Sequence, residues 1–476
     1  MRRPIRTLRA KRNRPAGSMK FDLIVIGAGI AGASAAEEAT RRGSRVLVVD
    51  PFDAAQCAAR TGAIPLATLR QLSIRQRRPG VARGSSAHFA GVIAHVLGQR
   101  EERARAHADD ASARLARQGA HIFCGQGDVV EPHGVRLADG TLATGEAVLL
   151  ATGSAPRRPG RFPWDSGIAQ DSEAVLAASE LPRAALVIGA EEEGCEMAAV
   201  LAGLGVQVTL VERRRKLFRF ADRDLLDHLH LGFQRLGVTI VMEDEILAID
   251  VRGEGESLHA RVSMSSGRVE VCDRIIVAAG RTPRADFADV AGLDRDVRGF
   301  VAVDENGRTS LPWLFAAGDV TGPPFRVGTA VWQGRAASAN ALSGATRTPG
   351  ELTHCVHTHP QIATVGVGED ACRLLGRDVI VGSADERDLL VTSGTQDPVR
   401  VLKLVFDRET RVLLGVQIAG GMAVELIHVG ALLVGREARI DDVADMVLDH
   451  PAQCDAFRAA AWAALARAAI AAAPAA

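Results

Sequence analysis

The sequence has 476 residues with 57 basic and 57 acidic side chains, so its formal net charge is zero. A chain of this length exceeds one ordinary core, and an apolar content of 47% excludes disorder as the main state. The balanced charge argues against a nucleic-acid binder that works by bulk charge. No unbroken apolar run reaches the length of roughly eighteen residues that a membrane span needs.

The cysteines are dispersed and give no sign of a shared site. There are seven of them, and no two form a C-x-x-C pair. This pattern fits neither a secreted disulfide framework nor a metal site, so we expect no metal and a cytoplasmic protein.

The first eighteen residues differ from the rest of the chain. Residues 1–18 carry seven basic side chains and no acidic one, and they lack the apolar segment of a secretory signal. We expect a disordered basic tail, with the folded chain beginning near Met19.

A glycine-rich turn follows the first predicted strand. Residues 23–26 read LIVI, and Gly27, Gly29 and Gly32 then open a predicted helix. In such a turn the first glycine permits the bend, the second lets the backbone approach a pyrophosphate, and the third lets the helix pack on the strand. Asp50 ends the next apolar run, where a carboxylate can bind ribose hydroxyls. The pattern predicts a dinucleotide site at a helix N-terminus.

The same pattern returns further along the chain. Gly189 and Gly194 again bracket a turn between an apolar run and a predicted helix. Glu212 ends the following apolar run, and it lies 23 positions after Gly189, as Asp50 lies 23 positions after Gly27. Two such βαβ units predict two nucleotide-binding domains of the doubly wound type.

The remaining segments complete the predicted architecture. Stretches 127–150 and 238–279 are rich in strand-forming residues, and after about residue 350 strand-like runs precede an apolar helix at 423–434. We therefore predict an α/β protein with two Rossmann-like domains and a C-terminal α+β domain.

Five further motifs occur in the order typical of one protein family. Residues 151–153 read ATG, 280–283 read GRTP, 314–320 read LFAAGDV, 357–366 read HTHPQIATVG and 450–455 read HPAQCD. From Met19 to about Arg467 the chain resembles the pyridine nucleotide–disulfide oxidoreductases, which include lipoamide dehydrogenase and glutathione reductase. Segments 62–70 and 415–430 are most similar to the soluble pyridine nucleotide transhydrogenase branch.

This resemblance implies a homodimer that binds FAD. It implies that residues 19–155 and 282–348 form the FAD-binding and central domain, 156–281 an NAD(P)-binding-like domain, and 349–470 the dimerisation domain. The residues implied to hold FAD are Gly27, Gly29, Gly32, Asp50, Gly127, Thr152, Gly153, Gly318 and Asp319. Gly189, Gly194 and Glu212 are the corresponding NAD residues, and the sequence leaves open whether NAD(P) binds there.

The chain departs from the family at the redox disulfide. Counting back from Ile64, the two family cysteines fall on Ala58 and Ala63, with Cys57 one residue out of register. The family lysine falls on Ala67, so its acidic partner, Glu196, is left to be protonated or turned to solvent.

The second turn also departs, because Glu191 replaces its middle glycine. Glu191, Glu192 and Glu193 would satisfy the helix dipole themselves and repel a dinucleotide, at about 3–4 kcal/mol for a charge pair at 4–6 Å. If a dinucleotide binds, Glu212 favours NAD over NADP, and the arginines at 213–215 could blur that choice.

His450 and Asp455 match the family's catalytic histidine and its acidic partner. Two functions remain open. The first is an FAD-dependent NAD(P)H oxidoreductase that works without the disulfide, passing hydride in a transhydrogenase-like way to a nicotinamide nucleotide or another small redox substrate. The alternative is an FAD-binding homodimeric pseudoenzyme with a lost NAD(P) site and a regulatory or interaction role. A third hypothesis is an oxidase or reductase with another donor.

Overall fold

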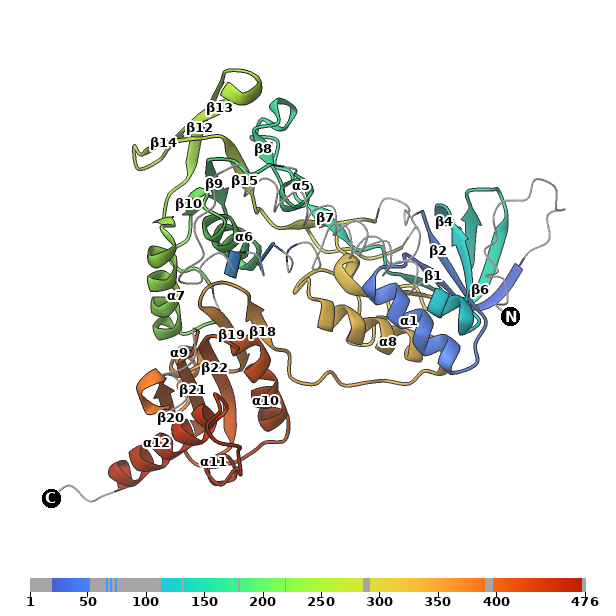
Figure 1. The fold of residues 1–476 in the computed structure, drawn as a ribbon. Helices are drawn as coiled ribbons and strands as arrows, with labels where there is room; N and C mark the ends of the chain where they lie inside the picture. Colours follow the sequence, from blue (N-terminus) through green and yellow to red (C-terminus); the bar gives the residue numbers. More distant parts are fainter. Residues whose placement is uncertain are drawn as a thin grey trace, which may run out of the picture.

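Three regions, each built on a β-sheet, make up the chain in the computed structural model (Figure 1). The structure describes residues 19–51, 66, 69–70, 73–74, 113–130, 132–178, 180–218, 220–285, 292–389 and 397–472. The predicted tail at 1–18 lies outside these residues, and so do positions 57, 58, 63 and 67.

The first region is a seven-stranded sheet with helices against it. Its elements are β1 (Met19–Ile26), α1 (Ile30–Arg41), β2 (Val46–Asp50), β3 (His121–Cys124), β4 (Gly127–Val130), β5 (Gly134–Leu137), β6 (Leu142–Leu150), β17 (Leu314–Ala316), η3 (Gly318–Thr321) and α8 (Val327–Ser343). The order is β3-β2-β1-β6-β5-β4, with β17 paired to β6. Helices α1 and α8 lie side by side (Figure 1), and their alanines share one core with β1 and β2.

The second region repeats the β-α-β start of the first. Its elements are β7 (Ser154–Pro156), η1 (Trp164–Ser166), β8 (Ala169–Gln170), α5 (Ser172–Ala177), β9 (Ala184–Ile188), α6 (Glu192–Gly203), β10 (Gln207–Glu212), α7 (Arg223–Leu236), β11 (Thr239–Met242), β12 (Ile246–Arg252), η2 (Gly255–Ser257), β13 (His259–Met264), β14 (Val269–Cys272), β15 (Arg274–Val277) and β16 (Arg281–Pro283). A parallel sheet runs β11-β10-β9-β15-β8, and β12-β13-β14 form a separate antiparallel sheet. The ribbon of β7 and β16 lies between the first two regions (Figure 1).

The third region is an antiparallel sheet of order β18-β19-β22-β21-β20. Its elements are β18 (His354–Val356), β19 (Gln361–Gly366), α9 (Glu369–Leu374), β20 (Val379–Asp385), η4 (Glu386–Asp388), β21 (Val399–Asp407), β22 (Leu413–Gly420), α10 (Ala423–Gly435), α11 (Ile440–Ala444) and α12 (Asp455–Ala472). Helix α10 packs on β19 and β22, and α12 packs on β20 and β21, which places both helices in one core.

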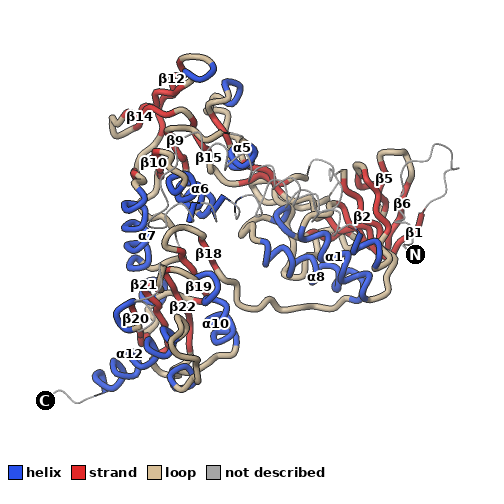
Figure 2. Tube along the Cα trace, in the orientation of Figure 1, coloured by secondary structure: helices blue, strands red, loops and turns tan. Residues whose placement is uncertain are grey.

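The second and third regions share a core. Phe233 of α7 belongs to the same buried cluster as Ile362 of β19. Ion pairs also join the two regions. Lys403 of β21 is buried, and its Nζ lies 3.0 Å from the carboxylate of Asp222, which precedes α7, and 2.7 Å from that of Glu369. The first region reaches the third through the extended chain 344–353 (Figure 2). The second and third regions are therefore packed as one body.

The predicted fold class is confirmed: two Rossmann-like sheets, the first parallel except for the antiparallel pairs β4-β5 and β5-β6 and the second parallel throughout, precede an α+β region. Strands β4 to β6 lie in the predicted stretch 127–150, and α10 covers the predicted helix at 423–434. No helix in the described part of the chain combines the length and apolar character needed to cross a bilayer.

Candidate functional site

Most of the predicted nucleotide-site residues line one cavity of about 2160 Å³. They are Gly27, Gly29, Asp50, Gly127, Thr152, Gly153, Gly189, Glu212, Gly318 and Asp319. Gly32 and Gly194 are buried and lie away from the cavity wall, where they let α1 and α6 approach their strands. His450 and Asp455 do not line this cavity.

The first glycine-rich turn leaves room at the N-terminus of α1. Gly27 has a φ of +101°, and a Cβ there would lie 2.3 Å from the carbonyl oxygen of Ala151. A Cβ on Gly32 would lie 1.9 Å from the oxygen of Gly27, whereas a Cβ on Gly29 would meet nothing within 4 Å. The outer two glycines are therefore required by packing, and the middle one faces open space at a helix N-terminus, where an anion is stabilised.

Asp50 closes this turn through its carboxylate. The backbone N–H of Ala28 donates to Asp50 Oδ2 at 2.5 Å, which ties the end of β2 to the turn after β1. Gly127 begins β4 beside it, and a Cβ there would lie 2.9 Å from side-chain carbons of Val49 and Val135. Gly127 is thus fixed by strand packing, and it lines the cavity with its backbone.

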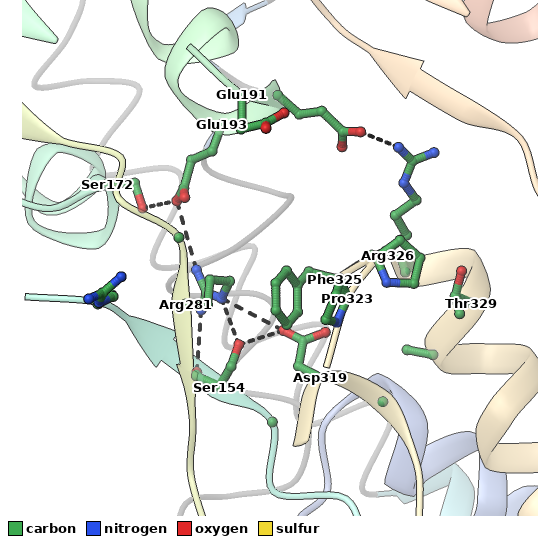
Figure 3. A pocket seen from close by; sticks show the side chains of 18 of the residues that line it. Ser154, Ser172, Glu191, Glu193, Arg281, Asp319, Pro323, Phe325, Arg326 and Thr329 are labelled. Carbon is green, nitrogen blue, oxygen red and sulfur yellow. Dashed lines mark hydrogen bonds and ion pairs between the residues drawn. The ribbon is translucent and has the colours of Figure 1, made fainter. Parts of the chain in front are cut away.

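The far wall of the first site holds Asp319 in place. Ser154 Oγ donates to Asp319 Oδ2 at 2.7 Å, and Arg281 Nε donates to Ser154 Oγ at 2.6 Å (Figure 3). Gly318 has a φ of +79°, and a Cβ there would lie 2.8 Å from Ala31 of α1. Asp319 therefore presents a half-buried carboxylate to the cavity at a fixed place.

Thr152 and Gly153 connect this wall to the end of β6. Thr152 Oγ1 donates to the carbonyl of Arg284 at 2.6 Å, and Gly153 adopts a φ of +74° with no atom near a Cβ position. An open helix N-terminus, two placed carboxylates and exposed backbone together fit the diphosphate, ribose and ribitol parts of FAD.

The second turn has the same backbone plan as the first. Gly189 has a φ of +97°, and a Cβ there would lie 2.4 Å from the carbonyl oxygen of Ala278. A Cβ on Gly194 would lie 1.8 Å from the oxygen of Gly189, and the N–H of Ala190 donates to Glu212 Oε2 at 2.8 Å. Of the three glycine positions, only the middle one is changed, because Glu191 stands there at the N-cap of α6, and Glu192 and Glu193 follow where the first turn has Ile30 and Ala31.

The three glutamates of this turn lie at the N-terminus of α6, Glu191 at the N-cap and Glu192 and Glu193 in the first turn. Glu191 makes no side-chain capping bond. Instead, each glutamate meets an arginine from another element: Glu191 with Arg214, Glu192 with Arg326, and Glu193 with Arg281 at 3.8 Å. The last of these pairs can be followed in Figure 3. Ser172 also donates to Glu193. The repulsion expected for three bare carboxylates is therefore largely compensated.

Glu212 is held by four donors. Its Oε1 accepts from the backbone N–H and from Nε of Arg214, both at 3.0 Å, and its Oε2 accepts from Ala190 and, at 3.1 Å, from Arg214 Nη2. Burial alone would raise the pKa of Glu212, but these hydrogen bonds lower it below its ordinary value. The hydrogen bond to Glu212 in turn raises the pKa of Arg214.

The sequence left Glu196 either protonated or turned to solvent, and the structure favours the first alternative, because the side chain is half-buried. Its Oε1 accepts from the backbone N–H of His357 at 2.7 Å. Burial is the main reason that the pKa of Glu196 is raised to about 7, and the nearby glutamates raise it further. The His357 N–H and the positive charge of Arg70 act in the opposite direction and lower this pKa. Burial and Arg70 lower the pKa of the His357 ring to about 4. A carboxyl group that titrates near neutrality therefore lines the cavity.

His450 and Asp455 form a pair in the third region. His450 Nδ1 lies 2.5 Å from Asp455 Oδ2, and Arg458 Nη2 donates to Asp455 Oδ1 at 2.9 Å. The His450 side chain is 49% exposed, whereas that of Asp455 is 9% exposed. The pair is formed within one chain, and neither residue lines the cavity of that chain.

The arginine partners of the glutamates were missed by the sequence reasoning. Arg281 belongs to the GRTP motif, but the motif gave this arginine no role. Arg214 is one of three consecutive arginines, and the sequence did not distinguish it from the other two. Arg326 stood alone after an apolar PPF run, and that isolated charge beside the predicted site is the one sequence feature that singles it out.

Comparison with known proteins adds independent information. The family model described as "Pyridine nucleotide-disulphide oxidoreductase" matches residues 21–334, and the model of that family's dimerisation domain matches residues 352–461. Soluble pyridine nucleotide transhydrogenase from Mycobacterium tuberculosis is 29% identical over 463 residues, covering 93% of this chain and 96% of the relative. The Pseudomonas aeruginosa protein of that name is 29% identical over 464 residues, covering 93% and 97%.

Two solved structures share the fold. LpdA from Mycobacterium tuberculosis superposes with a TM-score of 0.82 at 22% identity, over 93% of this chain and 99% of that one. A Cu(II) complex of the HOCl-induced flavoprotein disulfide reductase RclA from Escherichia coli gives 0.80 at 22% identity, over 91% and 98%. At this identity the likeness concerns the fold.

Proposed function

Because the chain belongs to the pyridine nucleotide-disulphide oxidoreductase family and is therefore an oxidoreductase, we propose that it exchanges hydride between nicotinamide dinucleotides without a disulfide. One observation carries the proposal: a single cavity is lined by both glycine-rich turns, by Asp319 and by Glu196. The family cysteines fall on Ala58 and Ala63 in the sequence, so a disulfide of the family type would need another cysteine in their place, whereas hydride exchange through a flavin needs none.

The residues of the first turn fit FAD, and each has a defined task. The N-terminus of α1, open at Gly29, would bind the pyrophosphate, while Asp50 would accept hydrogen bonds from ribose hydroxyls. Asp319, oriented by Ser154, would accept from the ribitol chain. When bound, FAD would supply two-electron acceptance and release, so that donor and acceptor nucleotides need not meet.

Glu196 would hold a proton close to the reacting end of the cavity. Its carboxyl group lies on α6, bonded to the His357 N–H of the loop after β18. With a pKa raised to about 7, it can keep or release a proton at neutral pH, as acid–base groups require.

We further propose that the protein works as a homodimer. The match to the family's dimerisation domain covers residues 352–461, which contain the preformed pair of His450 and Asp455. Since His450 lies outside the cavity of its own chain and is half exposed, a second copy could receive it. There it would orient a substrate.

An anaerobic titration of the purified, FAD-loaded protein tests the function. We expect the flavin absorbance to fall within seconds after NADH or NADPH is added and to return with an oxidised nicotinamide nucleotide. Dithionite serves as the control for a reducible flavin. Reduction by dithionite but by neither nucleotide would instead support the non-catalytic FAD-binding protein. A protein that takes up no FAD would refute the proposal.

A further inference from the structure

Arg214 occupies the adenosine end of the second nucleotide site, between two carboxylates. Its Nε and Nη2 face Glu212 at 3.0 and 3.1 Å, and its Nη1 faces Glu191. All three side chains line the cavity described above. The planar guanidinium of Arg214 therefore donates from Nε and Nη2 to the buried Glu212, and from Nη1 to the exposed Glu191.

Glu212 is not available to a ribose. Both of its oxygens already accept two hydrogen bonds each, and its side chain is only 4% exposed. To bind ribose hydroxyls, it would have to give up the paired bonds to Arg214, which are charge-assisted and therefore strong. Glu212 is better placed to orient Arg214 than to touch a nucleotide.

Glu191 is the exchangeable partner. Its side chain is 52% exposed, and the structure places Arg214 as its ion-pair partner among the described residues. A phosphate that displaced this carboxylate would meet Arg214 Nη1 while Nε and Nη2 stayed on Glu212. Arg213 and Arg215 flank Arg214 in the sequence and are exposed, which adds two positive charges for a phosphate to meet.

We propose that Arg214, oriented by Glu212, binds the 2′-phosphate of NADP(H), so that the second site prefers the phosphorylated dinucleotide over NAD(H). The inference rests on the proposed function, because it presumes that a nicotinamide dinucleotide enters this site. It reverses the preference that Glu212 alone predicts from the sequence. In an NADP-type site an arginine near the end of this strand accepts the 2′-phosphate, and that is the position of Arg214.

Calorimetric titration of NADP⁺ and NAD⁺ into the FAD-loaded protein tests this without turnover. We expect NADP⁺ to bind about tenfold more tightly or better. The decisive variant is Glu212→Gln, which keeps the shape of the side chain. If Glu212 orients Arg214, this variant lowers the ratio of NADP⁺ to NAD⁺ affinity. If Glu212 holds a ribose instead, NAD⁺ binding weakens and the ratio rises, which overturns the proposal.

Arg214→Gln and Arg213→Gln form a matched pair. Both remove one positive charge from the cavity lining, but only Arg214 contacts Glu212 and Glu191. We expect Arg214→Gln to bring the two affinities within about threefold of each other, and Arg213→Gln to leave their ratio within about twofold of wild type. FAD content and melting temperature identify a variant that fails to fold.

Glu191→Gln provides a second test if the Glu212 or Arg214 variant fails to fold. It alters an exposed side chain, and it should tighten NADP⁺ more than NAD⁺ because Arg214 Nη1 is released. Equal tightening of both nucleotides, or a wild type that prefers NAD⁺, contradicts the specificity and leaves the proposed function standing. A wild type that binds neither nucleotide and is reduced by neither overturns both.

Discussion

The two glycine-rich turns of this chain share one backbone plan and differ in three side chains: Gly29, Ile30 and Ala31 in the first are Glu191, Glu192 and Glu193 in the second. In both, a glycine with positive φ lies against the carbonyl of the residue that follows a strand, another glycine lets the helix approach, and an acid accepts the N–H that follows the first glycine. At the middle position the first turn has Gly29 facing open space, whereas the second has Glu191 bound to Arg214. The backbone that makes a nucleotide site is thus separable from the charge that decides what enters it.

The largest expected effect comes from what the two turns share. Gly32→Ala and Gly194→Ala each place a Cβ less than 2 Å from a backbone oxygen, which forces helix and strand apart. Each should lower the free energy of unfolding by about 3 kcal/mol or more, since strain of this kind is severe. Melting curves measure the losses. Similar losses in both variants would support the common backbone plan, and a harmless substitution in either turn would break it. Gly43→Ala is a comparison without a clash: no atom lies within 4 Å of its Cβ position, so any loss of stability there comes from the positive φ alone.

The next largest effect is a pH dependence of stability that we expect from α6 and not from α1. Glu196 on α6 corresponds in position to Ser34 on α1. Because the native pKa of Glu196 is about 7 and its ordinary value is 4.5, the folded chain holds a proton in this interval that the unfolded chain has released. The resulting stabilisation is present below pH 4.5 and is lost as pH rises through 7.

Glu196→Gln should remove this loss. We expect the melting temperature of the variant to rise relative to wild type between pH 5 and pH 8, by an amount equivalent to at most about 3 kcal/mol. Ser34→Ala, which changes no charge, should show a constant offset over the same range. A constant offset in the Glu196 variant too would mean that its carboxyl group titrates normally.

A swap of the middle residue tests the comparison directly. Gly29→Glu puts into the first turn the carboxylate that the second turn carries, and the space around Gly29 leaves room for the side chain. We expect FAD affinity to fall about a hundredfold, because a carboxylate would then stand beside the negatively charged pyrophosphate. Flavin fluorescence on dilution measures the release of FAD. Gly29→Ala is the control, and a comparable loss in that variant would assign the effect to bulk and not to charge.

The reverse swap should have the smallest effect. Glu191→Gly restores the open middle position of the second turn, so nicotinamide dinucleotides should bind about tenfold more tightly. The gain is limited because Arg214 already compensates the charge of Glu191. Titration with NADP⁺ and NAD⁺ measures it, and unchanged affinity for both would show that Glu191 lies clear of the pyrophosphate.

The sequence predicted the parts of this arrangement that are local. The glycine spacing and the acids at 50 and 212 specify each turn within a short segment, and the strands of the third region follow from their apolar runs. The compensation of the glutamates was not predictable, because Arg326 lies 134 residues from Glu192. The inward orientation of Glu196 depends on the N–H of His357, 161 residues away, and no spacing rule connects them.

The core that α7 shares with β19 limits how this chain can change. Gly232 of α7 lies so close to the third region that a Cβ would meet the His359 carbonyl oxygen at 2.2 Å. Phe233 beside it packs in the same cluster as Ile362. Even if the second turn bound no nucleotide, its domain would still be needed, because without it the third region would lose one wall of its core. The third region's need for this shared core is therefore enough to retain the second region, while the residues of the second glycine-rich turn remain free to change.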